Sequence, residues 1–177
     1  RSTAPDARRM RAPGRGPLSG PASNTCAVGA RRRIVIDPGP AAPVHIQRIL
    51  DVTGGEVDRI LCTHSHPDHS PGAVPLQERA GAAVYGMPPP DDGFQDETYA
   101  PDRSLCDGDL IQDGETGLRV LHTPGHASNH ACLLLEASGL LFTGDHLMSG
   151  STVVILPPDG SMRLYVESLR RLRDMPI

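Results

Sequence analysis

One short stretch of the chain concentrates residues that bind metals, Thr63-His64-Ser65-His66-Pro67-Asp68-His69. Imidazole and carboxylate are the ligands that zinc and similar divalent metals take when thiolates are not offered. If residues 64–66 are extended, His64 and His66 point to the same side, because strand side chains alternate. Pro67 then turns the chain, so Asp68 and His69 can face the same position. Four such ligands on one loop could hold two metals rather than one, so the stretch predicts a metal site.

Two later positions repeat this arrangement of an apolar run followed by a metal-type residue. His126 lies in the turn Thr123-Pro124-Gly125-His126, and Asp145 follows the run 140–143 after Gly144. A single histidine after a turn is more often structural than functional. The four-ligand loop elsewhere in the chain makes both residues candidate ligands.

The elements that must position these residues follow from apolar periodicity and from turn residues. A hairpin of two strands opens the ordered part, strands and helices then alternate, and strand pairs return. This order predicts an α/β fold, an αββα sandwich of two sheets packed face to face with helices outside. The predicted strands are 25–28, 33–37, 57–62, 82–85, 109–111, 118–122, 131–136 and 140–143, and the predicted helices are 43–52, 70–81 (with Ser70 as its cap) and 161–173.

Composition excludes several kinds of chemistry. The chain contains 17 basic residues, all of them arginine, so Schiff-base chemistry and a phosphate-loop lysine are both excluded. The net charge of −4 gives no general attraction to nucleic acid or to an anionic membrane. The four cysteines are far apart and fit buried thiols in a reducing compartment, which predicts a cytoplasmic protein. No apolar run reaches the length of a membrane span, so we expect no membrane partner.

The first part of the chain differs in composition from the rest. Residues 1–22 are rich in Arg, Pro and Gly, and we expect an extended or mobile lead-in before one domain of residues 23–177. Its arginine cluster consists of Arg8, Arg9, Arg11 and Arg15. We interpret them as a solvated tail rather than as an RNA contact or a mitochondrial transit peptide. The transit-peptide alternative would place the protein in mitochondria.

The motifs T-H-S-H-P-D-H, T-P-G-H and F-T-G-D, in this order, resemble the successive metal motifs of the metallo-β-lactamase superfamily. The resemblance covers about residues 24–177. It implies that His64, His66 and His126 hold a first metal, that Asp68 and His69 hold a second, and that Asp145 bridges the two. The superfamily's last histidine ligand has no match here. The resemblance therefore implies a fold incomplete at its termini, lacking its last strands, and a weak second zinc site.

The resemblance also narrows the substrate. Residues 151–160, followed by Tyr165, resemble the branch of β-lactamase-like hydrolases that includes a mitochondrial endoribonuclease. Hydroxyacylglutathione hydrolases share the metal motifs but usually continue differently after T-P-G-H, where this chain has Ala127-Ser128-Asn129-His130. We expect either a small-molecule substrate or single-stranded RNA, and the sequence gives no oligomeric state.

These observations leave three hypotheses open: a dinuclear zinc phosphodiesterase or endoribonuclease, a glyoxalase II-like thioester hydrolase, and an inactive metal-binding fragment. In either enzyme two zinc ions would lower the pKa of a water held between them and provide hydroxide. Asp68 is the expected catalytic proton acceptor. His130 and His146 are candidates for contacts behind the ligands or with the substrate.

Overall fold

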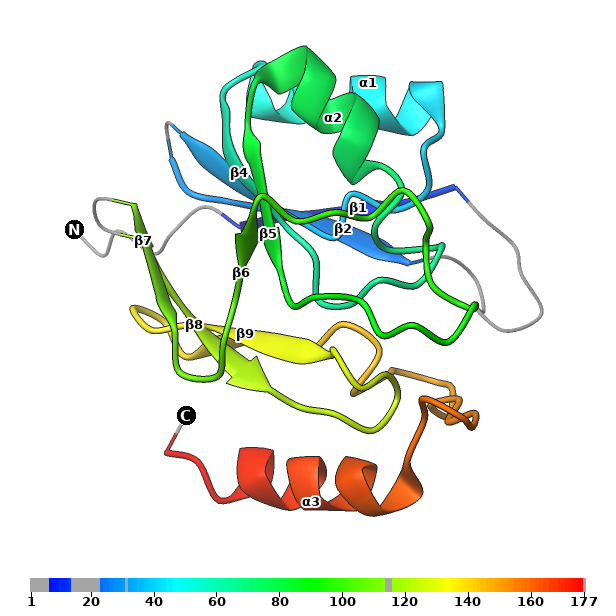
Figure 1. Ribbon diagram of the computed structural model, residues 1–177. Helices are drawn as coiled ribbons and strands as arrows, with labels where there is room; N and C mark the ends of the chain where they lie inside the picture. Colours follow the sequence, from blue (N-terminus) through cyan, green and yellow to red (C-terminus); the bar gives the residue numbers. More distant parts are fainter. Residues whose placement is uncertain (1–6, 14–22, 31, 114–115, 177) are drawn as a thin grey trace.

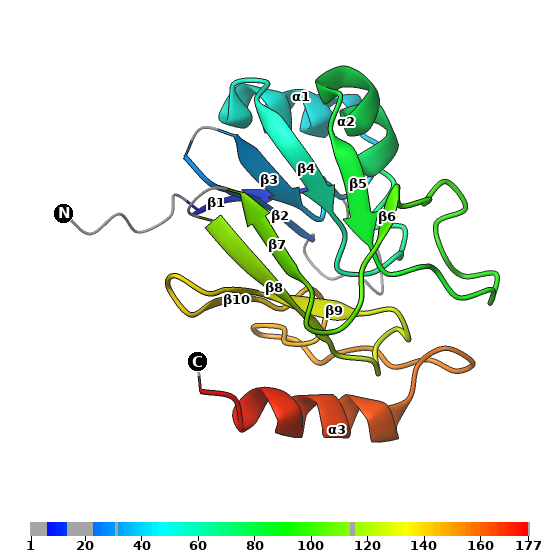
Figure 2. The ribbon, with the colours of Figure 1, turned by 60° about the vertical axis from the view of Figure 1, so that its left-hand side comes forward.

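The computed structural model describes residues 7–13, 23–30, 32–113 and 116–176. Two β-sheets pack face to face, with two helices over the outer face of one sheet and a third helix over the outer face of the other (Figures 1 and 2). This arrangement confirms the predicted αββα sandwich. The helices are α1 (Pro43–Thr53), α2 (Ala73–Ala80) and α3 (Met162–Arg173).

The first sheet is mixed and the second is antiparallel. The first has the order β1-β2-β3-β4-β5-β6, with antiparallel pairs up to β3 and parallel pairs from β3 to β6. The second has the order β10-β9-β8-β7. The strands of the first sheet are β1 (Ala7–Arg11), β2 (Asn24–Val28), β3 (Arg33–Ile36), β4 (Val57–Leu61), β5 (Ala83–Gly86) and β6 (Arg103–Ser104). Those of the second are β7 (Leu110–Asp113), β8 (Thr116–His122), β9 (Ala131–Leu135) and β10 (Leu140–Phe142).

Three apolar layers hold these elements together, one of them between the second sheet and α3. Between the sheets, Ile34 and Leu61 of the first sheet pack in one cluster with Leu118 of the second. Between the first sheet and its helices, Ile60 packs in another cluster with Ile49 of α1. Each layer buries aliphatic side chains, as expected for a chain with only 3% aromatic residues. The layer between the sheets fixes the two sheets relative to each other.

Two strands were not predicted, β1 and the short β6, which pairs in parallel with β5. Residues 7–11, expected to be part of an extended or mobile lead-in, form β1 and pair with β2 in a register that places Met10 opposite Thr25. Of the β1 side chains only Met10 is buried. Local periodicity therefore gives no signal, and backbone pairing with β2 defines the strand. The remaining lead-in residues, 1–6 and 14–22, lie outside the described residues.

The start of α2 also differs from the prediction. The helix begins at Ala73 after Gly72, and no side chain caps it. The Ser70 hydroxyl, expected to be the cap, instead donates to Asp96 Oδ2 at 2.7 Å. Asp96 lies in the long segment between β5 and β6. Its bond to Ser70 is a tertiary contact, which a local capping pattern cannot show. None of the helices in the described part of the chain has the length and apolarity needed to cross a bilayer.

The layer between the sheets provides a test of the fold. Leu118 is fully buried, whereas Leu140 on the edge strand β10 is 44% exposed. We expect Leu118→Ala to lower the free energy of unfolding by about 3 kcal/mol, since the truncation leaves a cavity. The matched control Leu140→Ala should change it by less than about 1 kcal/mol. Urea unfolding of both variants measures the difference, and equal losses would contradict this core.

Candidate metal centre

The candidate ligands come from the ends of strands in both sheets. The histidine motif 64–69 follows β4 of the first sheet, His126 follows β8 of the second, and Asp145 follows β10. The sheets face each other, so these three strand ends meet at one edge of the sandwich. Sequence reasoning placed each residue at a strand end, and the structure brings all of them together.

One group consists of three imidazoles. His64, His66 and His126 each offer a nitrogen, and these nitrogens all lie within 4.8 Å of one another. His66 Nδ1 is 3.0 Å from His126 Nε2, close to the separation of about 3.4 Å between two nitrogens on one tetrahedral zinc. The group matches the three histidines expected at the first metal.

A second group shares His64 with the first. His64, His69 and Asp145 also offer ligand atoms within 4.8 Å of one another. His69 Nε2 is 3.2 Å from Asp145 Oδ1 and 3.6 Å from Asp68 Oδ2. Asp145 Oδ2 also lies 3.9 Å from His126 Nε2, so this carboxylate reaches both groups, as a bridging ligand would. Asp68 lies beside this group, with its side chain 33% exposed.

A buried carboxylate that sequence reasoning did not select, Asp37, orients two of these histidines. Its Oδ2 accepts from His69 Nδ1 at 3.0 Å and from the Thr63 hydroxyl at 2.8 Å, and its Oδ1 accepts from the Thr63 amide at 2.7 Å. Thr63 Oγ1 then lies 3.0 Å from His64 Nδ1, and its own proton points to Asp37, so His64 Nδ1–H is the donor. Both rings are held with Nε2 free to face the centre.

His126 is oriented in the same way by a different group. Its Nδ1 lies 2.6 Å from the carbonyl oxygen of Val154, so the Nδ1–H donates there and Nε2 faces His66 and Asp145. Carboxylates and backbone carbonyls commonly fix ligating imidazoles in this manner. Asp37 follows β3 just as the other polar residues follow their strands, and this position is the signal that could have identified it.

The other two histidines named from the sequence, His130 and His146, lie behind the ligands. Both side chains are fully buried, so neither is placed to meet a substrate at the surface. The His130 ring centroid lies 5.1 Å from that of His64 and 5.6 Å from that of His146. His130 Nδ1 is 2.9 Å from the Thr123 hydroxyl. The His130 ring therefore packs against the candidate ligand His64, and the His146 ring packs behind it against His130.

The direction of the pKa shift divides the histidines of the centre into two kinds. Burial, together with the neighbouring imidazoles, lowers the pKa of His64 and of His130 well below the usual value and that of His66 to about 4. Burial acts in the same direction on His69, but Asp37 and Asp145 outweigh it and raise its pKa well above the usual value. His69 in turn lowers the pKa of Asp145, against the effect of burial.

These residues fit a divalent metal. Metal ligands must be deprotonated, and the lowered pKa values keep His64 and His66 neutral. His64 Nε2 is buried without a hydrogen-bond partner among the described residues. A buried polar nitrogen left unpaired costs about 1–3 kcal/mol, and a metal would satisfy it. Imidazole nitrogen with carboxylate oxygen is the donor set of zinc and of non-haem iron.

Hydrogen bonds also anchor the middle of the histidine motif. The Ser65 hydroxyl donates to Gln95 Oε1 at 2.6 Å and accepts from Asn129 Nδ2 at 2.8 Å. The Asp96 amide donates to the Ser65 carbonyl at 2.8 Å. The segment 87–106 and the turn after β8 therefore hold the loop in place. Neither Asn129 nor Gln95 was selected from the sequence.

The chain matches a superfamily model and several known proteins. The metallo-beta-lactamase superfamily profile matches residues 20–177. The chain is 38% identical over 140 residues to an atrochrysone carboxyl ACP thioesterase of Aspergillus chevalieri, covering 75% of this chain and 42% of that protein. It is 33% identical over 143 residues to a hydroxyacylglutathione hydrolase of Idiomarina loihiensis, covering 81% of this chain and 52% of that protein. The chain thus spans about half the length of the curated relatives it matches.

One solved structure that shares the fold was determined with metal bound. It is described as a di-iron-bound form, is 27% identical to this chain and superposes with a TM-score of 0.72. The match covers 91% of this chain and 84% of that one.

The first metal group can be tested by metal content. We expect the variant His64→Ala plus His66→Ala to lose most of the zinc bound by the wild type, because it removes two of the three nitrogens of that group. His122→Gln is the matched control, since His122 lies in β8 outside both groups. Elemental analysis after loading with excess zinc and desalting gives the stoichiometry. Unchanged zinc in the double variant would contradict the assignment.

The orienting role of Asp37 gives a second test. The carboxylate of Asp37 accepts hydrogen bonds from N–H and O–H donors of Thr63 and His69. In Asp37→Asn an amide NH₂, which is itself a donor, would face one or more of them. We expect zinc affinity to fall about 10- to 100-fold, as for other residues that orient metal ligands. Asp91→Asn, at an exposed position, should bind as the wild type does. Competition with a chromophoric chelator measures affinity, and circular dichroism checks folding. Wild-type affinity in a folded Asp37→Asn would overturn the role.

Proposed function

Because the chain belongs to the metallo-beta-lactamase superfamily, we propose that it is a dinuclear metal hydrolase of thioesters, with zinc as its metal. The observation that carries the proposal is the pair of adjoining ligand groups, one of three histidines and one around His69, with Asp145 within reach of both. Two adjoining sites of this kind suit two metals better than one. The curated relatives named above as a thioesterase and a hydroxyacylglutathione hydrolase support the choice of thioesters.

The residues would divide the work as follows. His64, His66 and His126 would hold the first metal, and His69, Asp68 and the bridging Asp145 the second. When bound, such metals supply Lewis acidity and lower the pKa of a coordinated water. Zinc and iron both suit these ligands, and metal analysis of the purified protein distinguishes them.

Asp68 is placed to accept a proton. Unlike the buried histidines it is a third exposed, and its Oδ2 lies within 3.6 Å of His69 Nε2. The Ser23 hydroxyl donates to the same oxygen at 2.6 Å, which fixes the orientation of the carboxylate. A carboxylate held in this way can take the proton of the attacking water and pass it to the departing thiolate.

A second candidate function is hydrolysis of RNA phosphodiesters. The observation that favours it is the arginine-rich strand β1, whose Arg8, Arg9 and Arg11 line a cavity next to the centre. A substrate screen separates the two functions. We expect zinc-loaded protein to hydrolyse S-lactoylglutathione or an acyl thioester and to leave a single-stranded RNA oligonucleotide intact. Cleavage of the RNA alone would select the second candidate.

The role of Asp68 gives a further prediction. Asp68→Asn should lower kcat for thioester hydrolysis by about 100-fold or more, since general acid–base groups typically contribute 10²- to 10⁴-fold. Its melting temperature should stay near that of the wild type, because the side chain is partly exposed and isosteric. Asp91→Asn is the control and should keep full activity. Near-normal turnover in Asp68→Asn would refute the role.

A further inference from the structure

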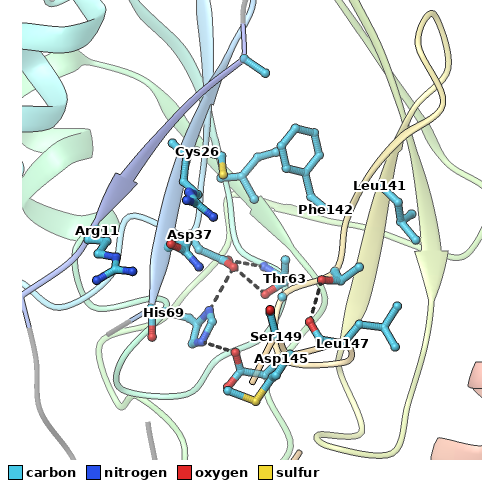
Figure 3. Close-up of a pocket in the computed structure, with 18 of the residues that line it drawn as sticks. Arg11, Cys26, Asp37, Thr63, His69, Leu141, Phe142, Asp145, Leu147 and Ser149 are labelled. Carbon is cyan, nitrogen blue, oxygen red and sulfur yellow. Dashed lines mark hydrogen bonds and ion pairs between the residues drawn. The ribbon is translucent and has the colours of Figure 1, made fainter. Parts of the chain in front are cut away.

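A large cavity opens beside the second ligand group. Its volume is about 630 Å³, and it lies between the first two strands of one sheet and the segment 140–151 that follows β9 of the other. Figure 3 shows Asp37, His69 and Asp145 at one end of it, with Arg11 and Cys26 on one side and Leu141 and Phe142 on the other. A molecule in this cavity would reach the candidate metal centre directly.

One wall of the cavity is basic. Arg9 pairs with Cys26 and Arg11 with Asn24 across the β1–β2 ladder. Directly paired residues share a face of the sheet, and all four line the cavity. Arg9 and Arg11 are exposed, and Arg8 also lines the cavity. In a chain with a net charge of −4, two guanidinium groups on one face form a local site for an anion.

The opposite wall is apolar. Leu141, Phe142, Leu147 and Met148 line it. Leu147 is 47% exposed, so an apolar group in the cavity can contact it. An apolar wall across from arginines suits a hydrocarbon chain that carries a charge. It suits RNA poorly, since RNA offers a continuous polyanion and of these four wall residues Phe142 alone is an aromatic that can stack on a base.

The basic wall is connected to the centre through backbone and side-chain contacts. The amide of Ala12, the residue after Arg11, donates to the Ser23 carbonyl at 3.0 Å. The Ser23 hydroxyl donates to Asp68 Oδ2 at 2.6 Å. The end of β1 that carries Arg11 is therefore fixed relative to Asp68, and an anion held there has a defined position with respect to the reacting atoms.

We propose that this cavity selects thioester substrates that carry an oxyanion on an apolar chain, and that Arg9 and Arg11 bind that oxyanion. The inference rests on the proposed function, because it names the substrate class of the same centre. The oxyanion could be a carboxylate at the far end of the acyl group or a phosphate of the thiol carrier. Guanidinium groups bind both through charge-assisted hydrogen bonds.

A set of four thioesters tests the proposal: glutaryl and pentanoyl groups, each on coenzyme A and on neutral N-acetylcysteamine. We expect Arg9→Gln plus Arg11→Gln to raise KM about 10-fold for the substrates with the recognised oxyanion, with kcat little changed and pentanoyl-N-acetylcysteamine unaffected. Arg170→Gln, at an exposed position of α3, is the matched control. A rise in KM confined to glutaryl esters identifies the acyl carboxylate as the bound oxyanion. A rise confined to coenzyme A esters identifies the carrier phosphate. Equal changes for all four thioesters, or none, overturn the proposal.

If no thioester is hydrolysed, the proposed function fails, but equilibrium binding still tests whether the arginines bind an oxyanion. Calorimetry compares glutarate with pentanoate, and phosphopantetheine with pantetheine, on zinc-loaded protein. In at least one pair the wild type should bind the more anionic member about 10-fold more tightly, and the double arginine variant should lose this preference. No preference in either pair overturns the proposal. So does salt-sensitive binding of an RNA oligonucleotide that depends on both arginines while neither pair shows a preference.

Discussion

The centre depends on one buried carboxylate, Asp37, and on the three hydrogen bonds it accepts. Two come from Thr63 and one from His69, at 2.7 to 3.0 Å. Burying a carboxylate is costly unless its oxygens are satisfied by hydrogen bonds, and here the donors are the residues that carry or orient ligands. The same contacts tie the end of β3 to the loop after β4. Asp37 has a φ of +50°, a left-handed backbone conformation that Asp tolerates better than most residues.

The packing of the two sheets is the second requirement. His64, His66 and His69 are delivered by the first sheet, while His126 and Asp145 come from strand ends of the second. The aliphatic layer that joins Leu61 to Leu118 therefore sets the distance between the two halves of the centre. Because a packed core resists small shifts, it can hold ligands from separate sheets at coordination distance.

The centre is also asymmetric in a way that suits catalysis. Behind it, His130 and His146 are buried and block access from the interior. On the open side, Asp68 is partly exposed and the cavity with the arginines of β1 begins at His69 and Asp145. This cavity leads to the centre from the side where the arginines of β1 lie. The centre therefore has a buried back and a front that opens into the cavity.

The sequence by itself determined the types of the ligands and the fold class. The histidine motif, His126 and Asp145 each follow an apolar run, and both the runs and the ligand types are local properties that one chain displays. Tertiary structure decided the rest. Asp37 resembles an ordinary residue at the end of a strand until Thr63 and His69 lie against it. Arg9 and Arg11 resemble a solvated tail until β1 pairs with β2, and Ser70 resembles a helix cap until Asp96 takes its hydroxyl. In each case the deciding contact joins residues far apart in the chain, which no local pattern of hydrophobicity or turn residues can encode.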